Sequence, residues 1–176
     1  MGHSIDQFIS KWQDTEGGQE RANYALFLTE LCQILEVPSP DPAGATTETN
    51  DYVFERAVPR TGRDGAKSYG RIDLYKRGSF VLEAKQSRQK GGSKEIAQND
   101  LFVADRKAKA TTSREWDVLM LNARQQAEDY ARHLPNSHEW PPFIIVCDVG
   151  NCFEIYADFT GKGRNYSQYH AQRHCQ

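Results

Sequence analysis

Two short runs of alternating apolar residues, separated by a turn, constrain this chain more than any other feature. Residues 68–76 and 80–86 are predicted to form the strands of a β-hairpin around Gly78. With a three-residue loop, Asp73 faces Glu83 across the hairpin and the apolar residues share one face. A two-residue loop would put the two carboxylates on opposite faces and mix the apolar sets. The hydrophobic pattern therefore selects the register that brings the carboxylates together.

This register predicts a different character for each face of the hairpin. The apolar face, suited to a core, carries Ile72, Leu74, Phe80, Leu82 and Ala84. The other face carries Asp73, Tyr75, Val81, Glu83 and Lys85. The second face therefore holds the groups that could perform chemistry.

Two carboxylates placed directly opposite each other on neighbouring strands repel and destabilise the pair. A divalent cation reverses that effect, and Mg²⁺ typically takes one or two protein carboxylates. Lys85 lies two residues beyond Glu83 on the same face, where its ammonium can orient a water or stabilise charge on a phosphate. Asp73 and Glu83 as metal ligands, with Lys85 beside them, fit phosphodiester hydrolysis. The competing interpretation is a solvated, charged strand face, since Glu-x-Lys is common by chance.

The charge distribution favours a nucleic-acid partner, although the formal net charge of the chain is -2. Eleven basic residues lie between Arg56 and Lys94, against only three acidic ones. A local basic field attracts phosphate whatever the total charge. The side chains that we expect to contact DNA are Arg63, Lys67, Arg71, Arg88 and Lys90.

The remaining pattern predicts an α/β fold of helix, strand, hairpin, helix and two strands. The expected helices cover residues 4–13, about 19–36 and about 95–133, and the expected strands outside the hairpin cover 52–58, 143–149 and 152–157. The last helix is expected to break near 111–113, with a helix start at Ser113. We expect one domain over 1–160, followed by a spacer start or tail over 161–176.

Composition argues against a membrane or secreted protein. No apolar run approaches the roughly 18 residues that span a bilayer, and the first residues do not resemble a signal peptide. Four cysteines without a Cys-x-x-Cys pair predict free thiols in a cytoplasmic protein and argue against a structural zinc site.

Three segments together resemble the PD-(D/E)xK nuclease superfamily. Residues 70–73 resemble its Gly-x-x-Asp element and residues 83–85 its Glu-x-Lys element, while residues 126–130 resemble the Gln-x-x-x-Tyr element of RecB-like members. The resemblance implies a restriction-endonuclease-like core, a central mixed sheet flanked by helices, with Gln126 and Tyr130 as accessory groups. It also implies a metal-proximal glutamate on the first core helix, for which we prefer Glu20 to Glu30.

A closer resemblance covers nearly the whole chain. Residues 20–24, 70–86, 140–143, 148–150 and 156–159 are similar to the N-terminal part of MmeI-like enzymes, which combine a nuclease, a helical spacer and an adenine methyltransferase. The resemblance implies an Mg²⁺-dependent endonuclease acting on double-stranded DNA in the cytoplasm of a bacterium or archaeon, with Mn²⁺ as a substitute. Methyltransferase and target-recognition parts would be its partners, in the same polypeptide or separate.

The chain departs from that family pattern in one respect, and other functions stay open. It has no Asn-Pro-Pro-Tyr motif and no Gly-rich loop after a strand, so we expect no S-adenosylmethionine site here. One alternative is a non-catalytic DNA-binding or assembly module of a restriction or phage-defence system. Another is a RecB-like exonuclease or a ribonuclease. Cleaving both DNA strands with one site per chain requires a homodimer or two sequential nicks.

Overall fold

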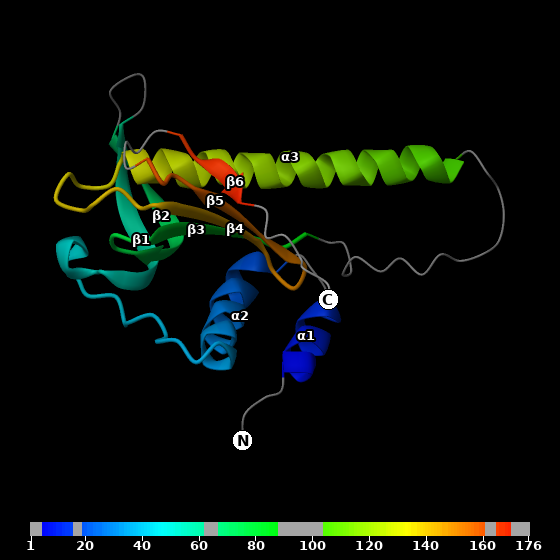
Figure 1. Ribbon diagram of the computed structural model, residues 1–176, viewed down its shortest axis with the longest axis horizontal. Helices are drawn as coiled ribbons and strands as arrows, with labels where there is room; N and C mark the ends of the chain where they lie inside the picture. The colour runs from blue at the N-terminus through cyan, green and yellow to red at the C-terminus, as the bar shows by residue number, and fades with distance from the viewer. Residues whose placement is uncertain (1–4, 16–18, 62–66, 88–103, 161–164, 170–176) are drawn as a thin grey trace.

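The computed structural model describes residues 5–15, 19–61, 67–87, 104–160 and 165–169. The elements are α1 (Ile5–Gln13), α2 (Glu20–Ile34), η1 (Thr47–Thr49), β1 (Tyr52–Thr61), β2 (Lys67–Lys76), β3 (Phe80–Lys85), α3 (Ala104–Arg132), β4 (Phe143–Asp148), β5 (Cys152–Ala157) and β6 (Ser167–Tyr169). The described strands form one six-stranded sheet in the order β1-β2-β3-β4-β5-β6, in which β3 and β4 run parallel and the other neighbours antiparallel. Figure 1 shows α3 along one side of this sheet and α1 and α2 on the other. The predicted α/β fold with a mixed sheet flanked by helices is confirmed.

Both faces of the central hairpin are buried. On the α3 side, Ile72, Tyr75 and Val81 belong to a cluster with residues of α3. On the α2 side, Leu74 and Leu82 belong to a cluster with aromatic residues of α1 and α2. The expectation of one core face is therefore too simple, because a parallel β3–β4 pair in the middle of a sheet is covered from both sides.

The predicted three-residue loop and register are confirmed next to the turn, but Asp73 and Glu83, which were expected to face each other, are not paired in the ladder. Leu74 pairs with Leu82 and Lys76 with Phe80, and Gly78 in the loop has a positive φ of 64°. The placement of Ile72 is wrong, since it was expected to share a face with Leu74 but packs in the α3-side cluster. Side-chain alternation is therefore interrupted between these two residues, at the position of Asp73.

The long helix also corrects the sequence analysis. α3 runs without a break from Ala104 to Arg132, so neither the gap near 111–113 nor the helix start at Ser113 is present. Thr and Ser are weak helix formers, but a few of them do not interrupt a helix that packs on a sheet. The predicted helical residues 95–103 lie outside the described residues. No helix in the described part of the chain is long and apolar enough to cross a membrane.

β6 was not predicted. Its residues Ser167–Tyr169 pair with β5, setting Tyr169 opposite Ile155. A three-residue strand of exposed side chains has no apolar alternation from which it could be predicted.

The division of the chain after residue 160 stays a prediction. Cys32, Cys147 and Cys152 are free thiols, as expected.

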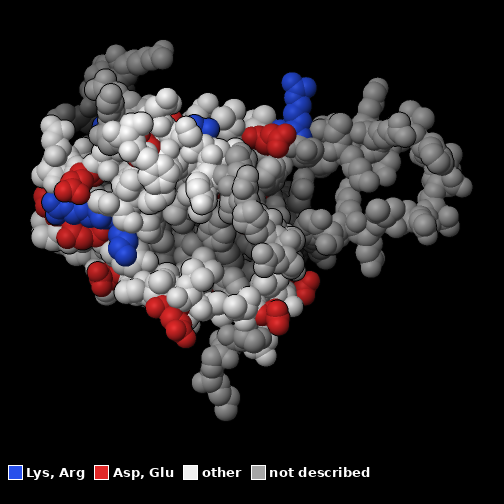
Figure 2. Space-filling view, in the orientation of Figure 1, with Lys and Arg blue, Asp and Glu red and all other residues white. Residues whose placement is uncertain are grey.

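Charged groups do not form a single basic patch on the face shown in Figure 2. Among the described residues on that face, basic and acidic side chains are interspersed around the rim and leave an uncharged expanse between them. Arg56, which contributes to the basic stretch of the sequence, is only 2% exposed. Its guanidinium lies over the Tyr75 ring at 4.6 Å from the ring centroid, so it belongs to the core and not to a phosphate-binding surface.

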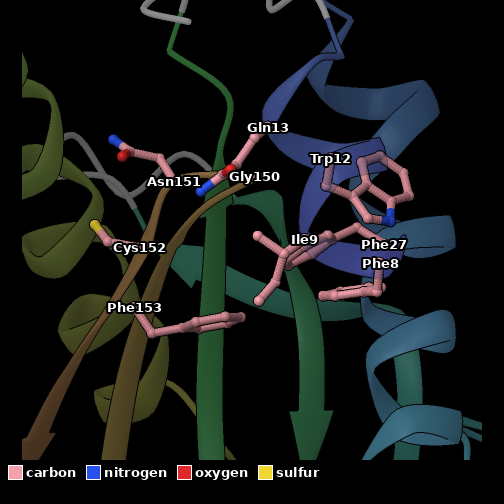
Figure 3. A pocket seen from close by; sticks show the side chains of 9 residues that line it. All are labelled: Phe8, Ile9, Trp12, Gln13, Phe27, Gly150, Asn151, Cys152 and Phe153. Atoms are coloured by element: carbon pink, nitrogen blue, oxygen red, sulfur yellow. The ribbon is translucent and has the colours of Figure 1, made fainter. Parts of the chain in front are cut away.

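The described residues also enclose a hollow of about 250 Å³ between α1, α2 and the β4–β5 turn (Figure 3). Aromatic side chains provide much of its lining, including Trp12, Phe27 and Phe153. Gly150 allows α1 to approach, because it has a φ of 78° and a Cβ there would lie 2.3 Å from the Trp12 carbonyl oxygen. Neither carboxylate of the predicted site lines this hollow.

Candidate active site

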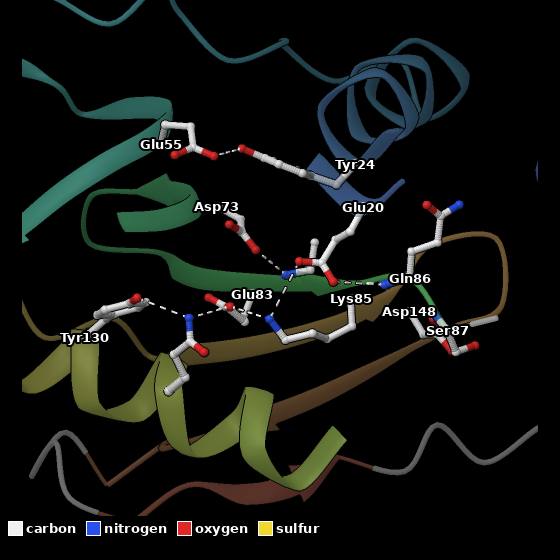
Figure 4. Close-up of polar contacts among 12 residues, drawn as sticks. Glu20, Tyr24, Glu55, Asp73, Glu83, Lys85, Gln86, Ser87, Tyr130 and Asp148 are labelled. Carbon is white, nitrogen blue, oxygen red and sulfur yellow. Dashed lines mark hydrogen bonds and ion pairs between the residues drawn. The ribbon is translucent and has the colours of Figure 1, made fainter. Parts of the chain in front are cut away.

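Glu83 lies at the centre of the site, on β3 beneath α3. Its side chain is only 2% exposed, which contradicts the interpretation of the hairpin as a solvated charged face. Its Oε1 accepts hydrogen bonds from Lys85 Nζ at 2.7 Å and from Gln126 Nε2 at 2.6 Å (Figure 4). The buried Oε2 has no hydrogen-bond partner among the described residues. A buried carboxylate oxygen left in this state is costly unless something binds it.

Asp73 comes from β2, at the point where side-chain alternation is interrupted. Its Oδ2 accepts a hydrogen bond from the backbone N–H of Ala84 at 2.7 Å, which ties it to the residue that follows Glu83. Burial raises the pKa of Asp73 to about 6, although the Ala84 N–H and the charge of Lys85 act in the opposite direction. The pairing of the strands therefore does not by itself account for the position of the Asp73 carboxylate.

The negative charge of Asp73 disfavours the ionised form of Glu83. Burial, and then the charge of Asp73, raise the pKa of Glu83 to about 8, against the opposing effect of Lys85. At neutral pH the metal-free site therefore holds fewer negative charges than its two side chains could carry. A bound cation would reverse this tendency, because it stabilises both ionised forms.

Lys85 lies on the same face of β3 as Glu83 and its side chain is 16% exposed. Burial lowers the pKa of Lys85, but the neighbouring Glu83 outweighs that effect and the net direction is upward. The ammonium therefore stays protonated. Its Nζ also lies 3.9 Å from Oε1 of Glu20, in the first turn of α2.

The structure distinguishes the two glutamates considered on the first core helix. Glu20 is near Lys85, and its Oε2 accepts a hydrogen bond from Gln86 N at 3.3 Å. Glu30 instead accepts a hydrogen bond from the Trp12 indole at 2.9 Å and pairs with Lys11. Glu20 is thus the one that α2 brings toward the hairpin.

The pair Gln126 and Tyr130 also reaches the site. Gln126 Nε2 donates to Glu83 Oε1 at 2.6 Å and to the Tyr130 hydroxyl at 3.1 Å. Tyr130 is only 4% exposed, so the pair is not part of an ordinary helix surface. One helical turn separates the two residues, which places both on the α3 face that covers the sheet.

The described protein groups do not form a complete metal-ligand set by themselves. Within the described ranges, no cluster of three or more His, Cys, Asp or Glu side chains is arranged to hold a metal ion. Asp73 and Glu83 would supply two oxygen ligands, and water or substrate oxygens would have to supply the others. That division is usual for Mg²⁺, which keeps several waters when bound to proteins.

Of the predicted DNA-contacting side chains, only Arg71 can be placed. It is 65% exposed and lies near Glu55, at 3.9 Å between Nε and Oε2. Lys67 begins β2, but its side chain is not described. Arg63, Arg88 and Lys90 lie outside the described residues.

Two further polar contacts lie near the candidate site. Gln86, which follows Lys85, is buried and accepts a hydrogen bond from Asn23 Nδ2 at 3.1 Å. The Tyr24 hydroxyl donates to Glu55, which has a φ of 52° in the middle of β1. A positive φ at a residue other than glycine is a strained conformation that no sequence pattern indicates.

One known protein family matches nearly the whole chain. The family model described as "MmeI, N-terminal domain" matches residues 3–174. The chain belongs to this family. Membership places it in the context of restriction-modification enzymes, as the N-terminal part of such a protein. Searches of curated proteins and of solved structures gave no significant match.

Proposed function

We propose that this chain is a nuclease domain of a restriction-modification enzyme and hydrolyses DNA phosphodiester bonds with the help of Mg²⁺ or Mn²⁺. The observation that carries the proposal is the environment of Glu83. Its Oε1 accepts hydrogen bonds from Lys85 and Gln126, and its buried Oε2 has no hydrogen-bond partner among the described residues. Burial raises the pKa of the neighbouring Asp73 to about 6, and a bound cation would stabilise the ionised forms of both carboxyls. Membership of the MmeI N-terminal family supports the same function.

The donor set fits the proposed ion. Asp73 and Glu83 offer only carboxylate oxygens, which hard cations such as Mg²⁺ prefer. A bound divalent ion supplies a coordinated water of lowered pKa and polarises a phosphoryl oxygen. Its charge would also remove the repulsion that raises the pKa of Glu83.

The side chains of the chain would divide the remaining work. The protonated Lys85 would stabilise the negative charge that develops on the scissile phosphate, and its bond to Glu83 fixes its direction. Gln126 would hold the Glu83 carboxylate in one orientation, and Tyr130 in turn holds Gln126. Glu20 lies close enough to Lys85 to influence where the ammonium rests. This division relies on preorganised groups that need no rearrangement during the reaction.

Double-stranded DNA is the proposed substrate, and the parts that recognise its sequence would lie elsewhere. Arg71 projects from β2 and is exposed, as a phosphate contact must be. The other basic residues predicted to contact DNA would add to it, and binding should weaken steeply with salt. Methyltransferase and target-recognition parts are proposed partners because the family is an N-terminal domain of MmeI. A homodimer or two sequential nicks would cut both strands.

Nicking of supercoiled plasmid by the purified chain tests the proposal. We expect nicking with Mg²⁺ or Mn²⁺, none with EDTA, and a loss of at least about a hundredfold in Glu83→Gln and Lys85→Met. The matched controls are Glu154→Gln on β5 and Lys76→Met at the far end of β2, and both should nick like the parent. Equal activity in Glu83→Gln and in the parent would refute the assignment.

The same assay separates the alternatives. A non-catalytic DNA-binding module would bind DNA in a salt-dependent manner but would nick in no lane. A RecB-like exonuclease, which the contact between Gln126 and Tyr130 keeps open, would degrade linear DNA and leave circular DNA intact. A ribonuclease would prefer RNA over both. Binding of Mn²⁺ without cleavage would indicate a site that depends on the recognition parts of the enzyme.

A further inference from the structure

Asp148, the last residue of β4, is a buried carboxylate that the proposed chemistry does not use. It is 0% exposed. Its Oδ1 accepts a hydrogen bond from the backbone N–H of Ser87 at 2.8 Å. Its Oδ2 accepts from Nε1 of Trp116 at 2.8 Å and from Nδ2 of Asn151 at 2.9 Å. Three donors satisfy a charge that would otherwise be too costly to bury.

These bonds join the end of β4 to the two elements that carry the candidate site. Ser87 lies two residues after Lys85, the last residue of β3, and Figure 4 shows it beside Asp148. In the parallel ladder Lys85 is the partner of Asp148, and Val149 N donates to the Lys85 carbonyl oxygen at 2.7 Å. The backbone on both sides of Gln86 is therefore held by the end of β4.

The bond to α3 has a second consequence. Trp116 and Gln126 are ten residues apart on this helix, or about 15 Å along its axis. Gln126 donates a hydrogen bond to Glu83, and Trp116 donates one to Asp148. Asp148 therefore links α3 to the end of the parallel pair of strands.

We propose that Asp148 is a positioning residue for the proposed nuclease reaction. It holds the end of β3 where the Lys85 ammonium meets Glu83, and it holds α3 where the Gln126 amide meets the same carboxylate. The inference rests on the proposed function and names a residue that acts on the reaction through these two side chains. It explains why a carboxylate with no exposure is placed at the end of the strand beside the predicted catalytic lysine.

The test compares Asp148→Asn with a matched control, Asp158→Asn, in the full chain. The first change keeps the shape of the side chain but can replace an oxygen with an N–H donor that faces other donors. Asp158 is also buried, at 4% exposed, and accepts hydrogen bonds from Thr160 N and Oγ1, two residues away. Three quantities are measured: the single-turnover nicking rate, the affinity for DNA, and the amide hydrogen exchange of residues 85–87 in the metal-free protein.

We expect Asp148→Asn to lower the nicking rate constant about ten- to a hundredfold, since small displacements of reacting groups cost rates of this size. DNA affinity should stay within about twofold of the parent, and residues 85–87 should exchange faster relative to the α2 core. Asp158→Asn should leave the rate constant and this exchange unchanged. A parent-like rate in Asp148→Asn, or an equal loss in both variants, would overturn the inference.

The exchange measurement keeps the two proposals separable. If the parent chain does not nick DNA under any condition, the proposed function fails and the rate carries no information about Asp148. Faster exchange confined to residues 85–87 in Asp148→Asn would still support its positioning role. Unchanged exchange at these residues would overturn that role, whether or not the chain is a nuclease.

Discussion

Replacing Glu83 by Gln in the metal-free protein should make the fold more stable as it removes the proposed activity. The folded protein binds a proton at Glu83 up to a pKa of about 8, whereas the same side chain has a reference pKa of 4.5. Between these values the folded state carries one more proton than the unfolded state. The free energy of unfolding of the parent should therefore fall as the pH rises, by about 1.4 kcal/mol per pH unit.

The pH window follows from the neighbouring groups. The pKa of Asp73 is raised only to about 6, so its own contribution is largely complete above that value. Between pH 6 and pH 7.5 the parent should lose about 2 kcal/mol through Glu83. Lys85 has a raised pKa, so the stability that it contributes is lost only at pH values well above this window. The lowered pKa of His138 acts in the opposite direction near pH 6, but equally in the parent and in the variant.

Urea denaturation followed by circular dichroism, at pH 6, 6.5, 7 and 7.5 in EDTA, measures this difference. The stability of Glu83→Gln relative to the parent should grow by about 2 kcal/mol across the series. Glu154→Gln, which changes a carboxylate that accepts a hydrogen bond from the Tyr156 hydroxyl, should show no such trend. A constant difference between Glu83→Gln and the parent across the four pH values would refute the reasoning.

Three further results are expected. The affinity for Mn²⁺, measured by calorimetry, should increase about tenfold from pH 7 to pH 9. Glu83 has a pKa of about 8 and must lose its proton to bind the ion. An affinity that does not change with pH would argue against Glu83 as a ligand. Gln126→Leu removes one donor from that carboxylate and should lower the nicking rate about tenfold with DNA affinity unchanged, whereas a parent-like rate would exclude an orienting role. Gly150→Ala should lower the free energy of unfolding by about 1 to 3 kcal/mol, because a Cβ would lie 2.3 Å from the Trp12 carbonyl oxygen at a φ of 78°. Gly44→Ala, whose Cβ would lie 3.4 Å from its nearest neighbour, is the matched control in thermal unfolding, and an equal loss in both would contradict this explanation.

The hairpin shows what can be derived from residue order alone. Apolar alternation in its two strands fixed the loop length, and the structure has that register, with Leu74 opposite Leu82. Side chains alternate between the two faces of a strand, so a shift of one residue would have moved the apolar set to the opposite face. For the same reason the sequence predicted Glu83 and Lys85 on one face.

The depth of the site was decided by tertiary structure. The sequence could not show that α3 covers the charged face, and it is this cover that buries Glu83 and raises its pKa. It could not place Ile72 correctly either, because no local pattern indicates the change in alternation at Asp73, where the side chain accepts a hydrogen bond from Ala84 N. The burial of a side chain depends on which helices and strands pack against it, and the residue order within one strand does not show this.

The contacts of Asp148 illustrate the same limit. An aspartate at the end of an apolar strand is compatible with a turn, a cap or a ligand, and only the fold brings Ser87, Trp116 and Asn151 to it. These donors lie 3 to 61 residues away along the chain. Local periodicity thus predicted most of the elements and the order of the candidate catalytic groups. The parallel pairing of β3 with β4 and the docking of α3 decided how those groups meet, because these contacts join segments that no local pattern relates.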